Sequence, residues 1–250
     1  MSVERILINP DAAAVAGAAA ARLITAILDA QSATGTASVV LTGGGTGIGT
    51  LQAVAASTAA ASVNWSAVDF WWGDERFIAA TDSERNDVQA HDALLSNVEV
   101  DPARVHRMPA ADGQFGDDPD AAAFWYAEQL AAAAANGRSP RFDVVMLGLG
   151  EEGHTASIFP HSAAATDPRS VCAVRNCPKP PPTRLTMTFE VLSHATDVWM
   201  LTAGKAKSEA IARAASGANR EELPCAGPKG IEQTLWMIDV AAATLLGQRN

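Results

Sequence analysis

A histidine inside a glycine-rich turn is the residue of this sequence best suited to proton transfer. Residues 142–160 (FDVVMLGLGEEGHTASIFP) predict a buried strand and then a turn rich in glycine, with His154 where we expect a helix to begin. An imidazole titrates near neutral pH, so a histidine at a strand end can accept and return a proton. Glu151 or Glu152 can orient the ring or tune its pKa. The alternative is a structural histidine that takes no part in chemistry.

A dense group of charges follows a second predicted strand. Residues 68–72 (VDFWW) run directly into Gly-Asp-Glu-Arg. Ligands of open α/β sheets bind beyond the carboxyl ends of the strands, so these charges are well placed for function. Asp74 or Glu75 can serve acid–base or orienting chemistry, and the guanidinium of Arg76 can bind a phosphate. The alternative is a solvated turn with an internal ion pair.

A glycine loop between a strand and a helix can bind a phosphate. In residues 39–54 (VVLTGGGTGIGTLQAV) the strand runs into Gly43 and Gly44, and a helix follows. Glycines let a ligand approach the backbone closely, and the unpaired N–H groups at a helix start favour an anion. The spacing loosely resembles a dinucleotide fingerprint, but the acidic residue expected about twenty positions later is not cleanly present. A tight turn without a ligand is the alternative.

Further cations stand at the ends of two other predicted strands. Arg184 begins a strand after the proline-rich run PKPPPTR, whereas Lys205 and Lys207 follow a strand in LTAGKAK. From these positions a cation can reach a cleft shared with the other motifs. The alternative for the two lysines is that they are solvated charges at the start of a helix.

The elements that must position these residues alternate between short apolar strands and longer, alanine-rich helices. This pattern is typical of parallel strands joined by crossover helices, so we expect one α/β domain over residues 1–250. The expected strands are 38–41, 68–72, 142–147, 171–174, 184–189, 198–202 and 234–238. The expected helices are 11–31, 48–60, 84–96, 119–135 and 205–215, with irregular loops at 98–119 and 178–182.

The composition is that of an acidic chain, with 48% hydrophobic residues and a formal net charge of -10. This charge opposes attraction to nucleic acid or anionic membranes, so a local cluster of cations must hold any anionic ligand. The N-terminal segment has neither the cationic start of a signal peptide nor an uninterrupted membrane span. Cys172, Cys177 and Cys225 match no zinc pattern, so we expect buried, inert thiols in a reducing cytoplasm. We expect no metal site, nucleic-acid partner or membrane contact.

The ordered set of motifs resembles the 6-phosphogluconolactonase family. TGG, GDER followed by an Asn, GxGxxGHTAS(I)FP, PKPPPTR and GKAK occur in that order across residues 39–240. The resemblance implies a Rossmann-like fold with a mostly parallel sheet and helices on both faces, similar to glucosamine-6-phosphate deaminase and ribose-5-phosphate isomerase. It also implies hydrolysis of 6-phospho-D-glucono-1,5-lactone to 6-phospho-D-gluconate in the pentose phosphate pathway, without an organic cofactor.

Matching positions in the family assign expected roles to residues of this chain. His154 corresponds to the catalytic base, and Asp74 to a polar position near the cleft that we group with it as catalytic. The residues expected to bind substrate are Thr42, Gly43, Gly44, Arg76, Asn86, Gly153, Arg184 and Lys207. Lys207 is preferred to Lys205 because the family lysine falls three residues after the glycine matched by Gly204.

The sequence departs from the family pattern in the glycine loop. Thr42 stands where the family often has Ser, Gly45 where Ser is common, and Gly47 where Pro is common. A hydroxyl contact from position 45 is therefore excluded, whereas donation by backbone N–H groups survives.

Two other functions remain as alternatives. A sugar-phosphate isomerase or deaminase shares the fold and the histidine, but the chain reads Ile-Phe-Pro where the deaminase family continues with Asn-Glu-Pro. A noncatalytic sugar-phosphate sensor is the third possibility. We expect the protein to be a monomer or a homodimer, and its activity to survive chelation because a lactone needs no Lewis acid.

Overall fold

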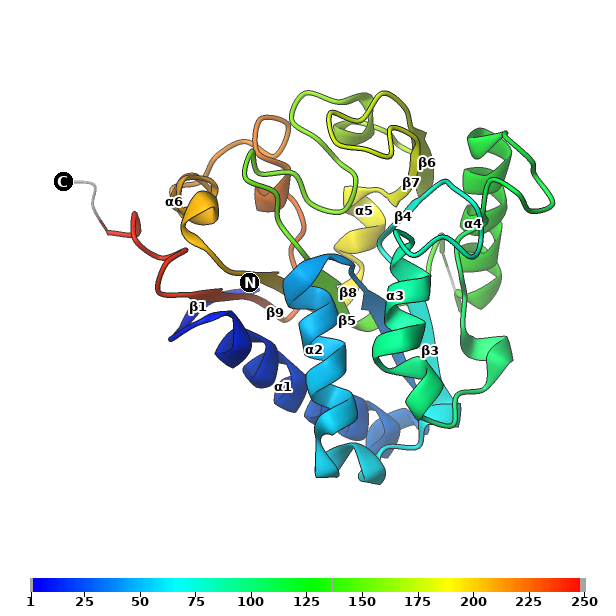
Figure 1. Cartoon of the computed structure of the whole chain (residues 1–250), viewed down its shortest axis with the longest axis horizontal. Helices are drawn as coiled ribbons and strands as arrows, with labels where there is room; N and C mark the ends of the chain where they lie inside the picture. Colours follow the sequence, from blue (N-terminus) through cyan, green and yellow to red (C-terminus); the bar gives the residue numbers. More distant parts are fainter. Residues whose placement is uncertain (1, 136, 248–250) are drawn as a thin grey trace.

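Six parallel strands form the central sheet of the computed structural model, which describes residues 2–135 and 137–247. Their order across the sheet is β1-β9-β8-β5-β2-β3 (Figure 1). The strands are β1 (Val3–Asn9), β2 (Ala37–Leu41), β3 (Val68–Trp72), β5 (Phe142–Leu147), β8 (Ala195–Thr202) and β9 (Gln233–Asp239). All pairings in this sheet are parallel, so the loops that follow the strands meet at one edge.

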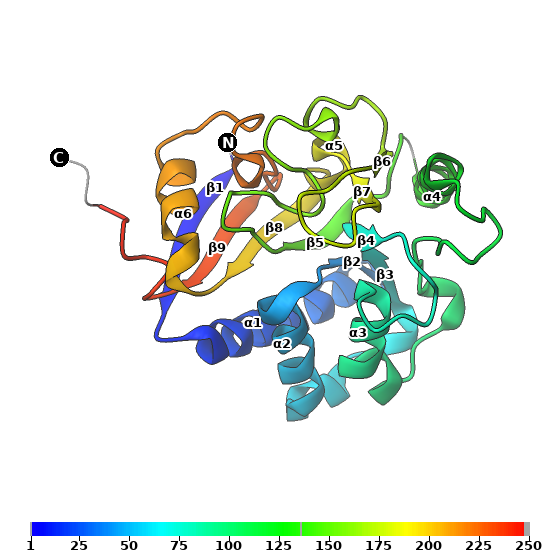
Figure 2. The ribbon, with the colours of Figure 1, turned by 45° about the horizontal axis from the view of Figure 1, so that its top comes forward.

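Helices cover both faces of this sheet, as predicted (Figures 1 and 2). One core contains residues of α1 (Ala12–Thr34), α2 (Gly44–Ala56) and α3 (Asn86–Ala93), and the other contains residues of α4 (Pro119–Ala133), α5 (Phe189–Leu192) and α6 (Ser208–Ala215). Successive strand residues point to opposite faces, so Val39 lies in the first core and Val40 in the second. Short 3-10 helices span Thr58–Ser62, Trp65–Ala67, Leu95–Asn97, Pro102–Arg104, Ala163–Ala165, Lys205–Lys207 and Pro224–Ala226.

The long helix α1 is apolar because it packs on the sheet. The Asp11 carboxylate caps its start by accepting a hydrogen bond from the N–H of Ala14 at 2.8 Å. By length and composition alone this helix can cross a membrane, with a mean hydropathy of 1.5 over 18 residues, but core helices of soluble proteins give the same weak signal. Its buried side chains account for that composition and are Val15, Ala16, Ala19, Ala20, Leu23, Ile24 and Ile27.

A small antiparallel sheet lies above the carboxyl edge of the main one. It consists of β4 (Asp74–Arg76), β7 (Arg184–Met187) and β6 (Val171–Val174), in the order β4-β7-β6. The pairing places Arg76 opposite Arg184, which brings together two motifs that are far apart in the sequence. The expectation of parallel strands was wrong for this part of the chain.

Several predicted boundaries also differ from the structure. The strand expected at 184–189 ends at Met187, and Phe189 begins α5. The helix expected at 48–60 begins at Gly44, and β1 and β4 were not predicted. No helix begins at His154, because Thr155 and Ile158 instead form an isolated β-bridge that closes a tight turn.

The buried carboxylate of Glu75 fixes the start of α3. Its Oε1 atom accepts hydrogen bonds from the N–H groups of Arg76 and Asn86, at 2.8 and 2.7 Å, and Oε2 accepts one from Asp87 at 2.8 Å. Glu75 is fully buried and lies 3.8 Å from the guanidinium of Arg85, which is also buried. A strand residue thus supplies the cap that α3 does not obtain from its own preceding residue.

We predict that Glu75→Ala lowers the free energy of unfolding by about 3 kcal/mol, because three N–H groups, two of them buried, lose their acceptor. Urea unfolding followed by tryptophan fluorescence measures this loss. Glu84→Ala changes an exposed glutamate of the adjoining loop and should cost less than about 0.5 kcal/mol. Equal stability of the two variants would contradict the capping role.

Candidate active site

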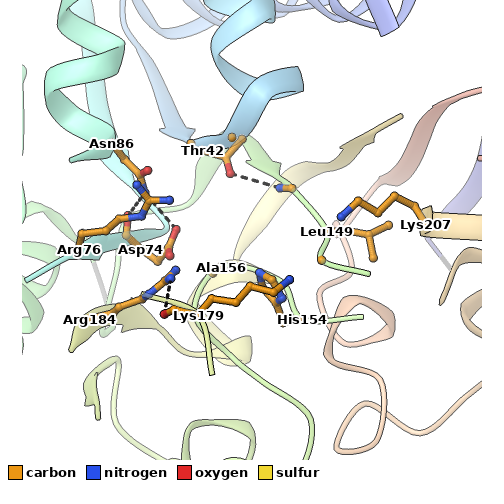
Figure 3. Close-up of a pocket in the computed structure, with 14 residues that line it drawn as sticks. Thr42, Asp74, Arg76, Asn86, Leu149, His154, Ala156, Lys179, Arg184 and Lys207 are labelled. Atoms are coloured by element: carbon orange, nitrogen blue, oxygen red, sulfur yellow. Dashed lines mark hydrogen bonds between the residues drawn. The ribbon is translucent and has the colours of Figure 1, made fainter. Parts of the chain in front are cut away.

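A cleft at the carboxyl edge of the main sheet brings together nine of the ten residues expected to act on or bind substrate (Figure 3). It encloses about 200 Å³ between the ends of β2, β5 and β8 and the small sheet. The nine are Thr42, Gly43, Gly44, Asp74, Arg76, Asn86, His154, Arg184 and Lys207; further lining residues are Gly148, Leu149, Gly150, Ala156 and Lys179. Gly153 does not line the cleft.

The turn before His154 is built so that the imidazole lies against the backbone. Gly150 donates a hydrogen bond to the carbonyl of His154 at 2.9 Å, and the imidazole packs against the Phe159 ring with centroids 4.6 Å apart. A Cβ atom at Gly150 would lie 2.0 Å from His154 Nδ1, so only glycine leaves room for the ring. Gly153 has φ +90°, and a Cβ there would lie 2.2 Å from Leu223, so this glycine shapes the turn from outside the cleft.

A chain of charged groups holds the imidazole. His154 Nδ1 lies 2.9 Å from Glu152 Oε1, and Lys179 Nζ donates to Glu152 Oε2 at 3.0 Å. When the imidazole is neutral, this contact keeps the proton on Nδ1 and leaves Nε2 as the acceptor. His154 is 16% exposed, so Nε2 is available to a small molecule while most of the ring is buried. Of the two glutamates considered from the sequence, Glu152 therefore orients the ring.

Burial and neighbouring charges shift the pKa values of His154 and Glu152 in opposite directions. Burial lowers the pKa of His154 below its usual range, while the Glu152 carboxylate partly opposes that shift. Burial alone would raise the pKa of Glu152, but its own backbone N–H, Lys179 and His154 together lower it to about 2. The neutral imidazole and the ionised carboxylate are thus the stable forms at neutral pH, which is the state a general base requires.

Asp74 and Asn86 form a buried polar network on the other side of the cleft. Asp74 Oδ2 accepts a hydrogen bond from Ser157 Oγ at 2.5 Å, and Asn86 Nδ2 donates to the backbone oxygen of Asp74 at 2.9 Å. The Oδ1 atom of Asn86 is buried and has no partner among the described residues. It also lies where a Cβ at Gly43 would be, 2.0 Å away, so the glycine loop and α3 meet here. An unsatisfied buried acceptor beside a cleft is suited to a ligand hydroxyl.

The cations of the cleft differ in how far the protein already uses them. Arg184 donates to the carbonyl oxygens of Lys179, Pro180 and Pro181 at 3.1–3.2 Å, and Arg76 Nη1 donates to the backbone oxygen of Glu84. The ammonium of Lys207 makes no hydrogen bond or ion pair with any described residue, and burial lowers its pKa.

Figure 3 shows Lys207 and Arg76 on opposite sides of the cleft. Lys205 is exposed and does not line the cleft, whereas Lys207 does.

Sequence reasoning missed Lys179 and Ser157. Lys179 lies in the run PKPPPTR and Ser157 in the histidine motif, but neither was predicted as a site residue. Their roles depend on contacts with residues 27 and 83 positions away in the chain, which no local pattern reveals.

The prediction of buried thiols is confirmed, since all three cysteines are free and buried. Within residues 2–135 and 137–247, no three His, Cys, Asp or Glu side chains gather as a metal-binding group.

Comparison with known proteins gives consistent matches over nearly the whole chain. The model of the family described as glucosamine-6-phosphate isomerases/6-phosphogluconolactonase matches residues 10–236. A 6-phosphogluconolactonase of Streptomyces coelicolor is 48% identical over 97% of this chain and 94% of its own. The structure of 6-phosphogluconolactonase from Trypanosoma cruzi has a TM-score of 0.81 at 25% identity, covering 99% of this chain and 98% of that one. A monomeric glucosamine-6-phosphate deaminase shares the fold, with a TM-score of 0.79 at 18% identity over 96% and 99% of the two chains.

We predict that Glu152→Gln lowers the pKa of His154 further, because the carboxylate that stabilises the imidazolium is lost. An NMR titration of the His154 imidazole in the free protein measures the midpoint. Glu151→Gln is the matched control, since the Glu151 side chain is exposed and makes no hydrogen bond to the ring. An unchanged or higher midpoint in Glu152→Gln would show that Glu152 does not act on His154.

Proposed function

The chain belongs to the family of glucosamine-6-phosphate isomerases and 6-phosphogluconolactonases, and from this premise we propose that its cleft hydrolyses 6-phospho-D-glucono-1,5-lactone with His154 as the general base. The product is 6-phospho-D-gluconate, and the reaction belongs to the pentose phosphate pathway. The observation that carries the assignment of the base is the pairing of His154 Nδ1 with Glu152, which leaves Nε2 as a proton acceptor in the cleft.

The reaction needs proton transfers in both directions. Neutral His154 takes a proton from a water molecule through Nε2 while the water oxygen attacks the lactone carbonyl carbon C1. The tetrahedral intermediate then collapses by breaking the bond between C1 and the ring oxygen O5, and the imidazolium returns the proton to O5. Glu152 stabilises the imidazolium between these steps, and the cations of the cleft favour the negative charge that develops on the carbonyl oxygen.

The rest of the cleft orients the substrate. Lys207 is a partly buried ammonium without an ion-pair partner among the described residues, so it is the cation best placed to bind the phosphate, together with the N–H groups of the Gly43–Gly44 turn. Arg76 lies across the cleft, and its buried Nε donor has no partner among the described residues, while Asn86 offers its Oδ1, also without such a partner, to a hydroxyl. Binding the phosphate in this way turns remote binding energy into orientation at C1.

The cysteines, the lining of the cleft and the net charge bear on the location, oligomeric state and partners of the enzyme. We propose a cytoplasmic location, because all three thiols are free, and catalysis by a single chain, because one chain supplies every proposed contact. The cleft draws on both sheets, which supports treating residues 1–250 as one α/β unit. We propose no nucleic-acid or membrane partner, since the net charge of -10 opposes attraction to nucleic acid and anionic membranes.

The reaction is tested by its products. The protein should release acid from 6-phosphogluconolactone, also after chelation, but no ammonia from glucosamine 6-phosphate and no ketose from ribose 5-phosphate. Ammonia or a ketose would favour the deaminase or the isomerase.

The assignment of the base is tested by a variant. His154→Asn should lower turnover at least about 100-fold with an unchanged melting temperature, because only proton transfer is lost. Near-normal hydrolysis by His154→Asn, after correction for spontaneous hydrolysis, would exclude His154 as the base.

Replacing Lys207 should chiefly weaken binding of the substrate phosphate. We predict that Lys207→Met weakens binding of 6-phosphogluconate by about 1.5–3 kcal/mol, the usual worth of a hydrogen bond to a charged group. Calorimetry measures the affinity, and Lys205→Met is the matched control because Lys205 lies two residues away and outside the cleft. If Lys207→Met binds as tightly as Lys205→Met, the phosphate lies elsewhere.

A further inference from the structure

Lys179 lies in a loop that is distant in the sequence from the histidine motif. It contacts Glu152, which in turn contacts His154. It belongs to the run Pro178–Pro182, and its side chain, 45% exposed, extends into the cleft (Figure 3). Its Nζ atom binds Glu152 Oε2 at 3.0 Å, while Oε1 of the same carboxylate faces His154. Both oxygens of Glu152 are therefore held, one by the cation and one by the imidazole, and this fixes the plane of the carboxylate.

The proline-rich loop is itself tied down by a buried arginine. Arg184 is 5% exposed, and its guanidinium donates to the backbone oxygens of Lys179, Pro180 and Pro181. The same guanidinium lies 5.9 Å from the centre of the Phe159 ring, which packs against the His154 imidazole. One buried side chain thus places both the residue that supports the imidazole ring and the loop that carries Lys179.

We propose that Lys179 is a positioning residue, which holds Glu152 in the orientation that presents His154 Nε2 to the substrate and sets the pH range of the base. This inference rests on the proposed function of His154. Glu152 is 34% exposed, so without Lys179 its Oε2 atom is held by no described residue, and the carboxylate can turn about its remaining contact with the imidazole. The Lys179 ammonium also repels the imidazolium, which favours the neutral base.

The charges around His154 determine whether its pKa rises or falls when Lys179 is replaced. Glu152 on its own turn and Asp74 on β4 favour the imidazolium, whereas Lys179 disfavours it. Lys207, beside α6, faces Lys179, Glu151 and Glu152, and burial lowers its pKa. Removing the charge of Lys179 should therefore raise the pKa of His154. The base then becomes protonated at higher pH, so the acid limb of the kcat/KM profile should move to higher pH.

Two measurements on Lys179→Met test the proposal. NMR titration of the free protein should show the His154 midpoint moved to higher pH, and the acid limb of kcat/KM should move with it. The kcat on the plateau should fall roughly tenfold, because the ring is less well oriented. Lys179→Arg, which keeps the charge and can still bind Glu152, should restore the midpoint, the acid limb and the kcat, and Lys205→Met should change none of the three.

The outcomes separate this proposal from the function on which it rests. An unchanged His154 midpoint together with a raised KM would show that Lys179 binds substrate, and would overturn the positioning role. Loss of activity in Lys179→Arg as severe as in Lys179→Met would also overturn it. If the wild-type protein does not hydrolyse the lactone, the proposed function fails, whereas the NMR midpoint still reports on the contact between Lys179, Glu152 and His154.

Discussion

The parallel register of β3, β2 and β5 is the constraint on which the cleft depends. Val40 on the central strand pairs with Trp71 on one side and with Val145 on the other, so the three strands end at nearly the same level. Thr42 and Gly148 follow two of these ends directly, and the hydroxyl of Thr42 accepts a hydrogen bond from the N–H of Gly148 at 3.2 Å. A slip of one residue would turn the side chains to the opposite face and separate these loops.

Above this edge, buried acids connect segments that the sheet alone does not position. Glu75 holds the first N–H groups of α3. Asp74 accepts hydrogen bonds from Asn86, through its backbone oxygen and its carboxylate, and from Ser157 of the histidine segment, through its carboxylate. Each carboxylate is nearly or fully buried and is satisfied by several donors, so moving one partner leaves another unpaired. The cleft is therefore preorganised by its polar contacts, while the two apolar cores supply the platform beneath it.

The sequence predicts the part of this arrangement that is local. The strands ending at Trp72 and Leu147 follow from runs that are apolar apart from one aspartate each. The charged and glycine motifs follow directly after them, so residues such as Asp74 and His154 could be assigned to one edge. The small antiparallel sheet could not be predicted, because β4 has only three residues and its partner β7 lies more than 100 positions away. The turn at His154 was mistaken for a helix start because the bridge between Thr155 and Ile158 has no periodic signal.

The same distinction explains why Arg184 was expected only as a ligand for anions. From the sequence, an arginine beside a cleft is a free cation, and nothing indicates how many of its donors the protein already uses. In the structure its guanidinium binds three carbonyl oxygens of the proline-rich loop, whereas Lys207 keeps its ammonium unpaired among the described residues. A carbonyl satisfies a donor without neutralising its charge, so Arg184 still contributes positive potential to the cleft. In a chain with a net charge of -10, this arrangement places positive charge in the cleft where we propose that the phosphorylated substrate binds, while the geometry stays fixed.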